Sequence, residues 1–362
     1  MKEPGTVIMA HPLRAPMAEA LQRSLAPLTV PVVYDPQPDG DPSPLRTAKE
    51  AWKKWDRERS HLLVLQDDAH PVPGFGERLA EWLRHQEHSA VAFYVNGSGV
   101  HGSYRLRRAA FAGYGRALLA PWEYTPCVAL AVETALAEEL AGHLASYEDS
   151  FAADDEAVAE FFRGRKIPVT ALTVSPVGHA QVSSLVGNAG HGSRPAVASG
   201  HEAPVDALPD LLDGSRYLHT VNVLRGQCVV DLPTEGEPFF DRAFRNFEEW
   251  HPWKTASDYF GLDAADLAAA GRDRTENARE RIGDGPAAAL VDEFWAAGCL
   301  LGADIRAEQG EAPLHLREIL ARTWVRCAAE LAGIACDRAD VETIAALTVE
   351  AVGFGRRSEA QR

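Results

Sequence analysis

Two neighbouring carboxylates, Asp67 and Asp68, are the first residues whose type and position could do chemistry. They follow the apolar run "LLVL" at 62–65 and Gln66, so two negative charges come directly after a predicted buried strand. Like charges in contact repel, and near a core they are costly unless both face water or a positive charge lies between them. Mg²⁺ and Mn²⁺ prefer oxygen ligands and would supply that charge. The pair is a candidate metal site, with solvated acids in a turn as the alternative.

A glycine motif competes with the acid pair. Gly97, Gly99 and Gly102 in "NGSGVHG" match GxGxxG, which binds a dinucleotide when it follows the first strand of a βαβ unit. Here the motif follows the fourth predicted strand, and the residues after it make a poor helix. A flexible glycine loop is the favoured interpretation.

Further candidates are acids and histidines later in the chain. Asp154 and Asp155 begin a predicted helix, where acids are favoured by capping and by the helix dipole, although either could be a general base. His179, His191 and His201 lie in a glycine-rich segment, and their spacing matches no standard metal pattern. Ser-His-Asp chemistry lacks support because no G-x-S-x-G occurs.

The elements that must position these residues alternate between strand and helix. Strands are predicted at 5–10, 30–35, 61–66 and 90–95, and helices at 15–28, 47–59 and 73–86. This order predicts a mostly parallel, doubly wound sheet, whose ligands bind at the carboxyl ends of the strands. His11, Asp35 and the Asp67–Asp68 pair each follow a strand, so we expect them at one rim of the sheet.

The rest of the chain changes character towards its end. Residues 121–163 are predicted to be mainly helical, 167–176 a strand, and 177–204 a loop or lid. Amphipathic helical patterns dominate from about 210, which predicts domains at 1–208 and 209–362. The helical region is a candidate for acceptor binding, for homo-oligomer formation or for supporting the first domain. Its aromatic segment 239–253 could line an acceptor groove, but a packed helix is the favoured interpretation.

Composition limits the classes of function. The chain has 362 residues, 46% of them hydrophobic, and a formal net charge of -16, which argues against nucleic-acid binding but allows a small phosphorylated ligand. No apolar run approaches the roughly 20 residues of a membrane span. The first residues contain only a short apolar stretch and do not have the layout of a signal peptide. Five widely spaced cysteines without a CxxC pair predict free thiols and a cytoplasmic location.

Taken in order, several segments resemble a GT-A-fold nucleotide-sugar glycosyltransferase of the bacterial and phage type. The resemblance covers about residues 5–195 and rests on "VIMAHPLR", "VVYDP", "TAKEAWKKW", "HLLVLQDDAHPVPGF", "DDEAVAEFF" and "SSLVGNAGHGS". It implies a GT-A-like (Rossmann-like) sheet domain that moves a sugar from a nucleotide-diphosphate donor to an acceptor that the sequence does not identify. It also implies that a DxD-like motif binds a divalent metal, Mn²⁺ or Mg²⁺, which holds the donor diphosphate.

The resemblance carries roles to particular residues. The implied donor-side residues are His11, Pro12, Arg14, Asp35, Arg46, Thr47, Gln66 and Asp67. The implied metal ligands are Asp67, Asp68, His191 and Asn188. The implied acceptor-side base is Asp155, with Asp154 as the second choice.

Two departures from the family pattern keep other interpretations open. Gln66 takes the place of the first acid of DxD, and Asn188 stands where a metal-binding histidine is expected, with His191 as the substitute. A catalytically inactive GT-A-like binding or scaffold protein is therefore one alternative. An NAD-type oxidoreductase that uses "GSGVHG" is the other.

Overall fold

The computed structural model describes residues 2–84, 86, 89–149, 153–183, 185, 193–205, 210–212, 219–233 and 247–358. The chain forms two compact units, Met1–Asn96 with Leu118–Pro209, and Gly97–Ala117 with Asp210–Arg362. The predicted division after residue 208 falls one residue before the third junction, between Pro209 and Asp210. The prediction left Gly97–Ala117 in the first domain, whereas these residues belong to the second unit.

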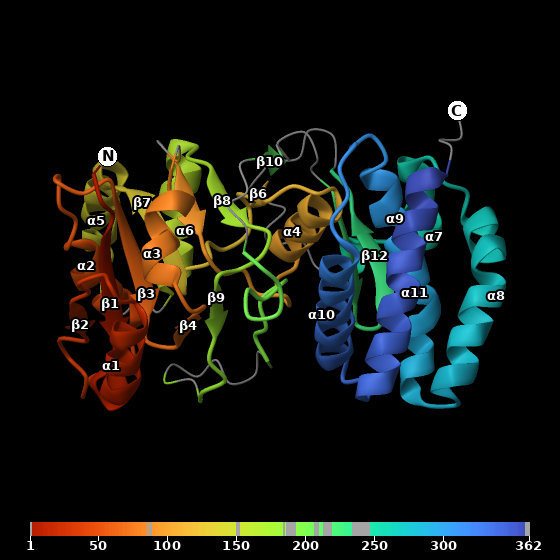
Figure 1. Cartoon of the computed structure of the whole chain (residues 1–362), viewed down its shortest axis with the longest axis horizontal. Coiled ribbons are helices and arrows are strands. Elements are labelled where there is room, and N and C mark those ends of the chain that lie inside the picture. Colours follow the sequence, from red (N-terminus) through yellow and green to blue (C-terminus); the bar gives the residue numbers. More distant parts are fainter. Residues whose placement is uncertain are drawn as a thin grey trace. The chain divides into compact units, whose positions relative to one another are not determined.

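The first unit is built on a mixed, mostly parallel sheet with helices packed against it (Figure 1). Six of its strands follow the order β8-β5-β7-β3-β1-β2. They are β1 (Gly5–Ala10), β2 (Val32–Tyr34), β3 (His61–Gln66), β5 (Ala90–Ala92), β7 (Ala129–Glu133) and β8 (Val169–Leu172). The helices are α1 (Ala15–Ser24), α2 (Pro44–Trp52), α3 (Phe75–Trp82), α5 (Thr134–Ala145) and α6 (Asp154–Arg165), with a 3-10 turn, η1, at Pro12–Arg14. The predicted α/β class is confirmed.

One strand of this sheet was predicted to be helix. Ala129–Glu133 is β7, which runs antiparallel to both of its neighbours, β3 and β5, whereas the other pairs are parallel. Its run "ALAVE" joins directly to the start of α5 at Thr134, so the apolar pattern gives no sign of a break. The prediction of continuous helix was wrong there, because a fully buried strand lacks the alternation that identifies a half-buried one.

The strand that carries the acid pair lies in the middle of the sheet. β3 pairs with β1 on one side and β7 on the other, and its four apolar residues at 62–65 are at most 2% exposed. Burying each such side chain contributes about 1.5–3 kcal/mol. The strand end that presents Asp67 is therefore held on both sides.

The second unit is mainly helical, as predicted, but also contains a small sheet. Its helices are α4 (His101–Phe111), α7 (Trp253–Ala256), α8 (Ala264–Ile282), α9 (Val291–Asp304), α10 (Leu314–Ala332) and α11 (Arg338–Arg357). Its antiparallel strands are β11 (Thr220–Leu224), β12 (Gln227–Asp231) and β13 (His251–Pro252), while β6 (Arg116–Leu118) and β10 (Leu211–Leu212) pair in parallel. The predicted helix at 239–253 lies partly outside the described residues, and its described end contains β13.

Helices α9 and α11 pack closely because glycines line their contact (Figure 1). A Cβ on Gly302 would lie 2.1 Å from the carbonyl oxygen of Val352, and one on Gly355 would lie 2.0 Å from that of Cys299. No side chain fits at those distances. Small residues here therefore set how near the two helices approach.

Helix α4 contradicts the prediction that the residues after the glycine loop make a poor helix, whereas residues 97–100 before it are not helical. Every residue of His101–Phe111 is buried, and the helix is anchored at Asp304. Asp304 Oδ2 accepts a hydrogen bond from the Tyr104 hydroxyl (2.6 Å) and from Arg108 Nε (2.8 Å), and His219 Nε2 lies 3.1 Å from Oδ1. Burial opposes ionisation of Asp304, yet His219 and Arg108 bring its pKa to about 2. Pairing of Arg108 with Asp304 thus allows one arginine of this helix to be buried.

Other predictions stand as follows. All five cysteines are free thiols, as predicted. No helix in the described part of the chain has the length and apolar character to cross a membrane. A cytoplasmic location and a homo-oligomer formed through the C-terminal helices stay predictions.

Candidate functional site

Three strand ends meet at one rim of the first unit, as predicted. Met9 of β1 pairs with Gln66 of β3, so the residues after both strands lie side by side. The backbone N–H of Asp35, which follows β2, donates to the carbonyl of Ala10 (3.0 Å). Parallel pairing therefore brings His11, Asp35 and Asp67 to one edge.

A positive charge lies between the two carboxylates of this rim. Arg14 Nη1 donates to Asp67 Oδ1 (2.9 Å) and to Asp68 Oδ2 (3.1 Å). Arg14 Nη2 donates to the carbonyl of Ser183 (2.6 Å). The three side chains are 14%, 8% and 12% exposed. Arg14, which ends η1, thus relieves the repulsion that the sequence places here.

His11 supports the same pair from the end of β1. Its backbone N–H donates to Asp67 Oδ2 (3.0 Å). Its Nδ1 accepts from the N–H of Leu13, so the proton lies on Nε2, which is 3.3 Å from the carbonyl of Pro38. Burial nonetheless raises the pKa of Asp67, and the bonds from His11 and Arg14 only partly oppose that effect. The carboxylate is held in place but its charge is not fully compensated.

One of the three candidate histidines, which the resemblance did not imply as a metal ligand, completes this cluster. His179 ends β9 (Val177–His179), which pairs with β4 (Ala69–Pro71), and it stands opposite Ala69. Its Nε2 therefore lies 3.5 Å from Asp68 Oδ2. Burial lowers the pKa of His179, which favours the neutral imidazole that binds metals.

The donor set suits a divalent cation, but the site is incomplete. Asp68 Oδ1 is buried and has no hydrogen-bond partner among the described residues, so one acceptor is left over. Two carboxylates and a neutral imidazole are suitable ligands for Mn²⁺ or Mg²⁺. Within the same part of the chain, however, no three His, Cys, Asp or Glu side chains are arranged to hold a metal ion. Arg14 occupies the position between the two acids.

Asp154, the second choice for the acceptor-side base, is linked to the acid pair through Gln66. Gln66 Nε2 donates to Asp154 Oδ2 (3.3 Å), and Asp154 begins α6. Burial, followed by the charge of Asp155, raises the pKa of Asp154 to about 7. A carboxylate with this pKa exchanges protons readily near neutral pH. Asp154, the second choice in the sequence, is thus the buried acid that contacts the rim through Gln66.

Asp155 differs from Asp154 in exposure and in partners. It is only half-buried, and its Oδ1 accepts from the backbone N–H of Glu156 (2.9 Å). Burial also raises the pKa of Asp155, and the hydrogen bond from Glu156 opposes the shift. We therefore prefer Asp154 to Asp155 as the proton acceptor.

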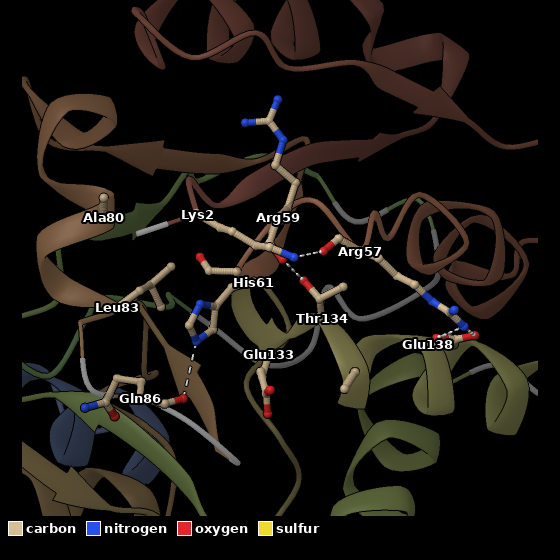
Figure 2. Close-up of a pocket in the computed structure, with 12 residues that line it drawn as sticks. Lys2, Arg57, Arg59, His61, Ala80, Leu83, Gln86, Glu133, Thr134 and Glu138 are labelled. Carbon is tan, nitrogen blue, oxygen red and sulfur yellow. Dashed lines mark hydrogen bonds and ion pairs between the residues drawn. The ribbon is translucent and has the colours of Figure 1, made fainter.

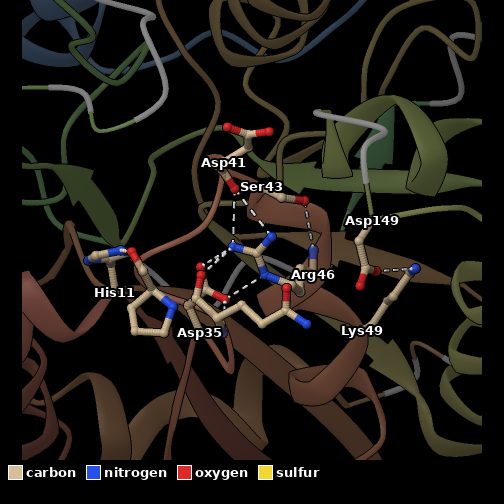
Figure 3. A network of polar contacts seen from close by, with 9 residues as sticks. His11, Asp35, Asp41, Ser43, Arg46, Lys49 and Asp149 are labelled. Atoms are coloured by element: carbon tan, nitrogen blue, oxygen red, sulfur yellow. Dashed lines mark hydrogen bonds and ion pairs between the residues drawn. The ribbon is translucent and has the colours of Figure 1, made fainter.

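Asp35 and Arg46, both predicted on the donor side, bind each other (Figure 3). Arg46 Nε and Nη2 donate to the two oxygens of Asp35, each at 2.7 Å, and Nη2 also donates to the carbonyl of Gln37 (2.9 Å). Both side chains are at most 7% exposed. The hydrogen bonds from Arg46 lower the pKa of Asp35. This pair closes the loop between β2 and α2 and has a structural explanation.

The remaining predicted residues are placed as follows. Pro12 opens η1 after His11, and Thr47 is buried within α2. Asn188 and His191, predicted as metal ligands, lie outside the described residues, as do residues 184, 186, 187, 189, 190 and 192 of the predicted loop or lid. Neither prediction is tested.

The first unit also has a cavity of about 640 Å³ at the opposite ends of the strands (Figure 2). It lies by Lys2 and by His61, the first residue of β3, far along that strand from Asp67. Arg57 Nη2 donates to both oxygens of Glu138 (2.9 and 3.1 Å) in its lining. We place the candidate site at the acid rim instead. There the Asp67–Asp68 pair, which suits a cation, lies next to Asp154, which has a raised pKa.

Comparison with known proteins does not assign this chain to a family. The sequence matches no protein-family model, and a search of curated proteins finds no significant match. The function must therefore be argued from the site.

Proposed function

We propose that the first unit is a glycosyltransferase that uses a nucleotide-diphosphate sugar. The observation that carries this proposal is the link from Asp67 through the adjacent Gln66 to Asp154. It brings an acid pair suited to a cation and a carboxylate suited to proton transfer to the same strand end. The likeness of residues 5–195 to GT-A transferases supports the same conclusion.

Each side of the site has a distinct task in this proposal. Asp67, Asp68 and His179 would hold a divalent cation, which supplies positive charge for the departing diphosphate when it is bound. Asp154 accepts the proton of the acceptor hydroxyl while that oxygen bonds to the anomeric carbon and the bond from this carbon to the diphosphate breaks. Gln66 orients Asp154 through its amide N–H. Arg14 and His11 hold the acid pair in position.

The test is binding and turnover of nucleotide sugars by the full chain. Thermal-shift measurements with UDP-, GDP- and dTDP-sugars, with and without Mn²⁺, should show metal-dependent stabilisation by one nucleotide class. NMR should then show slow release of the nucleoside diphosphate. If no nucleotide sugar stabilises the chain, with or without the metal, the proposal is wrong.

A catalytically inactive GT-A-like binding protein is the second candidate. It is favoured by the incomplete metal site and by Arg14 between the acids. The same experiments separate the two, because an inactive protein would bind the donor without releasing the diphosphate.

The oxidoreductase alternative has less support. The glycine motif runs into α4, all of which is buried, and Arg107 Nη2 donates to the carbonyl of Gly97 (3.0 Å). A dinucleotide needs exposed backbone N–H groups at the start of such a helix. Stabilisation by NAD(P) alone would revive this alternative.

A further inference from the structure

Two adjacent arginines of α4 are both buried but differ in their charge partners. Arg107 is 0% exposed and Arg108 is 3% exposed. Arg108 Nε donates to Asp304 Oδ2 (2.8 Å), which compensates its charge. Arg107, in contrast, forms no ion pair with any carboxylate in the part of the chain that the structure describes. An arginine is almost never fully buried without a charged partner, so the environment of Arg107 needs an explanation.

Neutral groups hold the Arg107 guanidinium in place. Its Nη1 donates to Ser103 Oγ (2.7 Å), one turn earlier in α4, and its Nη2 donates to the carbonyl of Gly97 (3.0 Å). The guanidinium also lies over the ring of Trp324, with Cζ 5.1 Å from the ring centroid. All of these residues belong to the second unit. They orient the guanidinium but supply no negative charge.

A nearby thiol does not supply the charge either. Cys327 lies three residues after Trp324 in α10, and its ionisation would act on the charge of Arg107. Burial raises the pKa of Cys327, so the thiol is neutral at pH 7. Burial lowers the pKa of Arg107, but only to about 10, so the guanidinium stays charged at pH 7. The described residues therefore leave a buried positive charge uncompensated.

The guanidinium also keeps a hydrogen-bond donor for a ligand. Arg107 Nε is buried and has no hydrogen-bond partner among the described residues. The N–H groups on Nε and on a neighbouring Nη form a planar fork that matches two oxygens of a carboxylate or a phosphate. An unsatisfied donor beside an uncompensated charge is therefore suited to an oxyanion.

We propose that the second unit binds a small oxyanion, a phosphate or carboxylate group, at the guanidinium of Arg107. The oxyanion accepts hydrogen bonds from the fork and supplies the missing negative charge. It enters along the loop before α4, which is half-buried at Ser98 and Val100. The site uses a side chain rather than the backbone N–H groups at the start of α4, so it does not require a dinucleotide. It is separate from the acid rim and goes beyond the proposed function.

Calorimetric titration of the full chain with inorganic phosphate, and separately with acetate, tests the proposal. At constant ionic strength the wild type should bind at least one of these two probes. Arg107→Met should weaken the Kd by about tenfold or more, because the charge and the fork are lost together. Arg107→Lys keeps the charge without the fork and should weaken it less. Arg57→Met, which removes an exposed arginine of the first unit, is the control and should leave the Kd unchanged.

Urea unfolding gives a second measurement, in which Arg108→Met is the matched variant. Without a probe, Arg107→Met should unfold at the same urea concentration as the wild type or a higher one, because it removes an uncompensated buried charge. Phosphate should then stabilise the wild type more than Arg107→Met, since any shift common to both is a general salt effect. Arg108→Met should unfold at lower urea with or without phosphate, because Asp304 loses a partner.

Each outcome decides for or against the site. Absence of binding of both probes to the wild type would overturn the proposal, and so would an unchanged Kd in Arg107→Met. A loss of stability in Arg107→Met that is the same with and without phosphate would show a structural role only. Circular dichroism checks folding, and Arg107→Lys carries the test if Arg107→Met does not fold. No nucleotide sugar is involved, so failure here leaves the proposed transferase activity untouched.

Discussion

Two arginine–aspartate clusters stand at the ends of β2 and β3, the strands on either side of β1, and differ in completeness. At the end of β2, Arg46 meets Asp35 with two hydrogen bonds of 2.7 Å and satisfies the loop carbonyls around it (Figure 3). At the end of β3, Arg14 is shared between Asp67 and Asp68 and leaves Asp68 Oδ1 without a partner among the described residues. The first cluster is saturated and the second is not.

The pKa directions follow the same division. Hydrogen bonds from Arg46 lower the pKa of Asp35, whereas burial raises the pKa of Asp67 although Arg14 is in contact with it. Saturated pairs stabilise a loop, and incomplete ones leave room for a ligand. The comparison teaches that a position at a strand end is not sufficient to propose a ligand site. The end of β3 is the candidate because Asp68 Oδ1 there lacks a hydrogen-bond partner among the described residues.

The largest expected effect is on turnover. Asp154→Asn should lower the rate of diphosphate release from the donor by about 10²–10⁴-fold, because the amide cannot accept the proton. Glu156→Gln, an exposed acid in the same first turn of α6, is the matched control and should stay near the wild-type rate. Equal losses in both variants would contradict the assignment of Asp154.

The next effect contrasts the two arginines in urea unfolding. Arg46→Met leaves the buried Asp35 unpaired and should cost about 3–5 kcal/mol, with no recovery when Mn²⁺ is added. Arg14→Met should also destabilise the chain, but Mn²⁺ should restore its stability by replacing the lost charge. If Mn²⁺ rescues both variants or neither, the distinction between the saturated and the incomplete cluster fails.

The pH dependence of stability should have opposite signs at Asp154 and Asp35. The folded pKa of Asp154 is raised to about 7, so the folded chain holds a proton that the unfolded chain has lost, and stability falls as pH rises from about 4 to 7. Asp154→Asn should reduce this fall by up to about 1.4 kcal/mol per pH unit. The lowered pKa of Asp35 stabilises the fold above its unfolded value of 3.8, and this contribution is lost as pH falls further. Unfolding curves across pH 3–8 measure both.

The smallest effect concerns an exposed pair beside the saturated cluster (Figure 3). Lys49 Nζ donates to Asp149 Oδ1 (2.7 Å), and the Asp149 side chain is 48% exposed. Asp149→Asn should cost less than about 1 kcal/mol, and the cost should shrink in 1 M salt. A larger, salt-independent loss would show that the comparison underrates exposed pairs.

The sequence by itself determined the acid rim and much of the α/β pattern. Apolar runs ending in polar residues identify β1 and β3 and place His11 and Asp67 at their ends, since an apolar run and the residues that follow it are local signals. The same pattern missed β7, whose buried run continues into α5, and α4, whose Arg108 is paired with Asp304 in the core.

Only the tertiary structure decided which charges meet. Arg14 reaches two acids more than fifty residues away, His179 lies beside Asp68, and Arg46 is paired with Asp35. Those contacts depend on strand register and on the packing of segments that are distant in the chain. Neither can be read from the type of a single residue. Whether a carboxylate pair is satisfied or left open is a property of that packing, because burial and the nearest counter-charge set its energy.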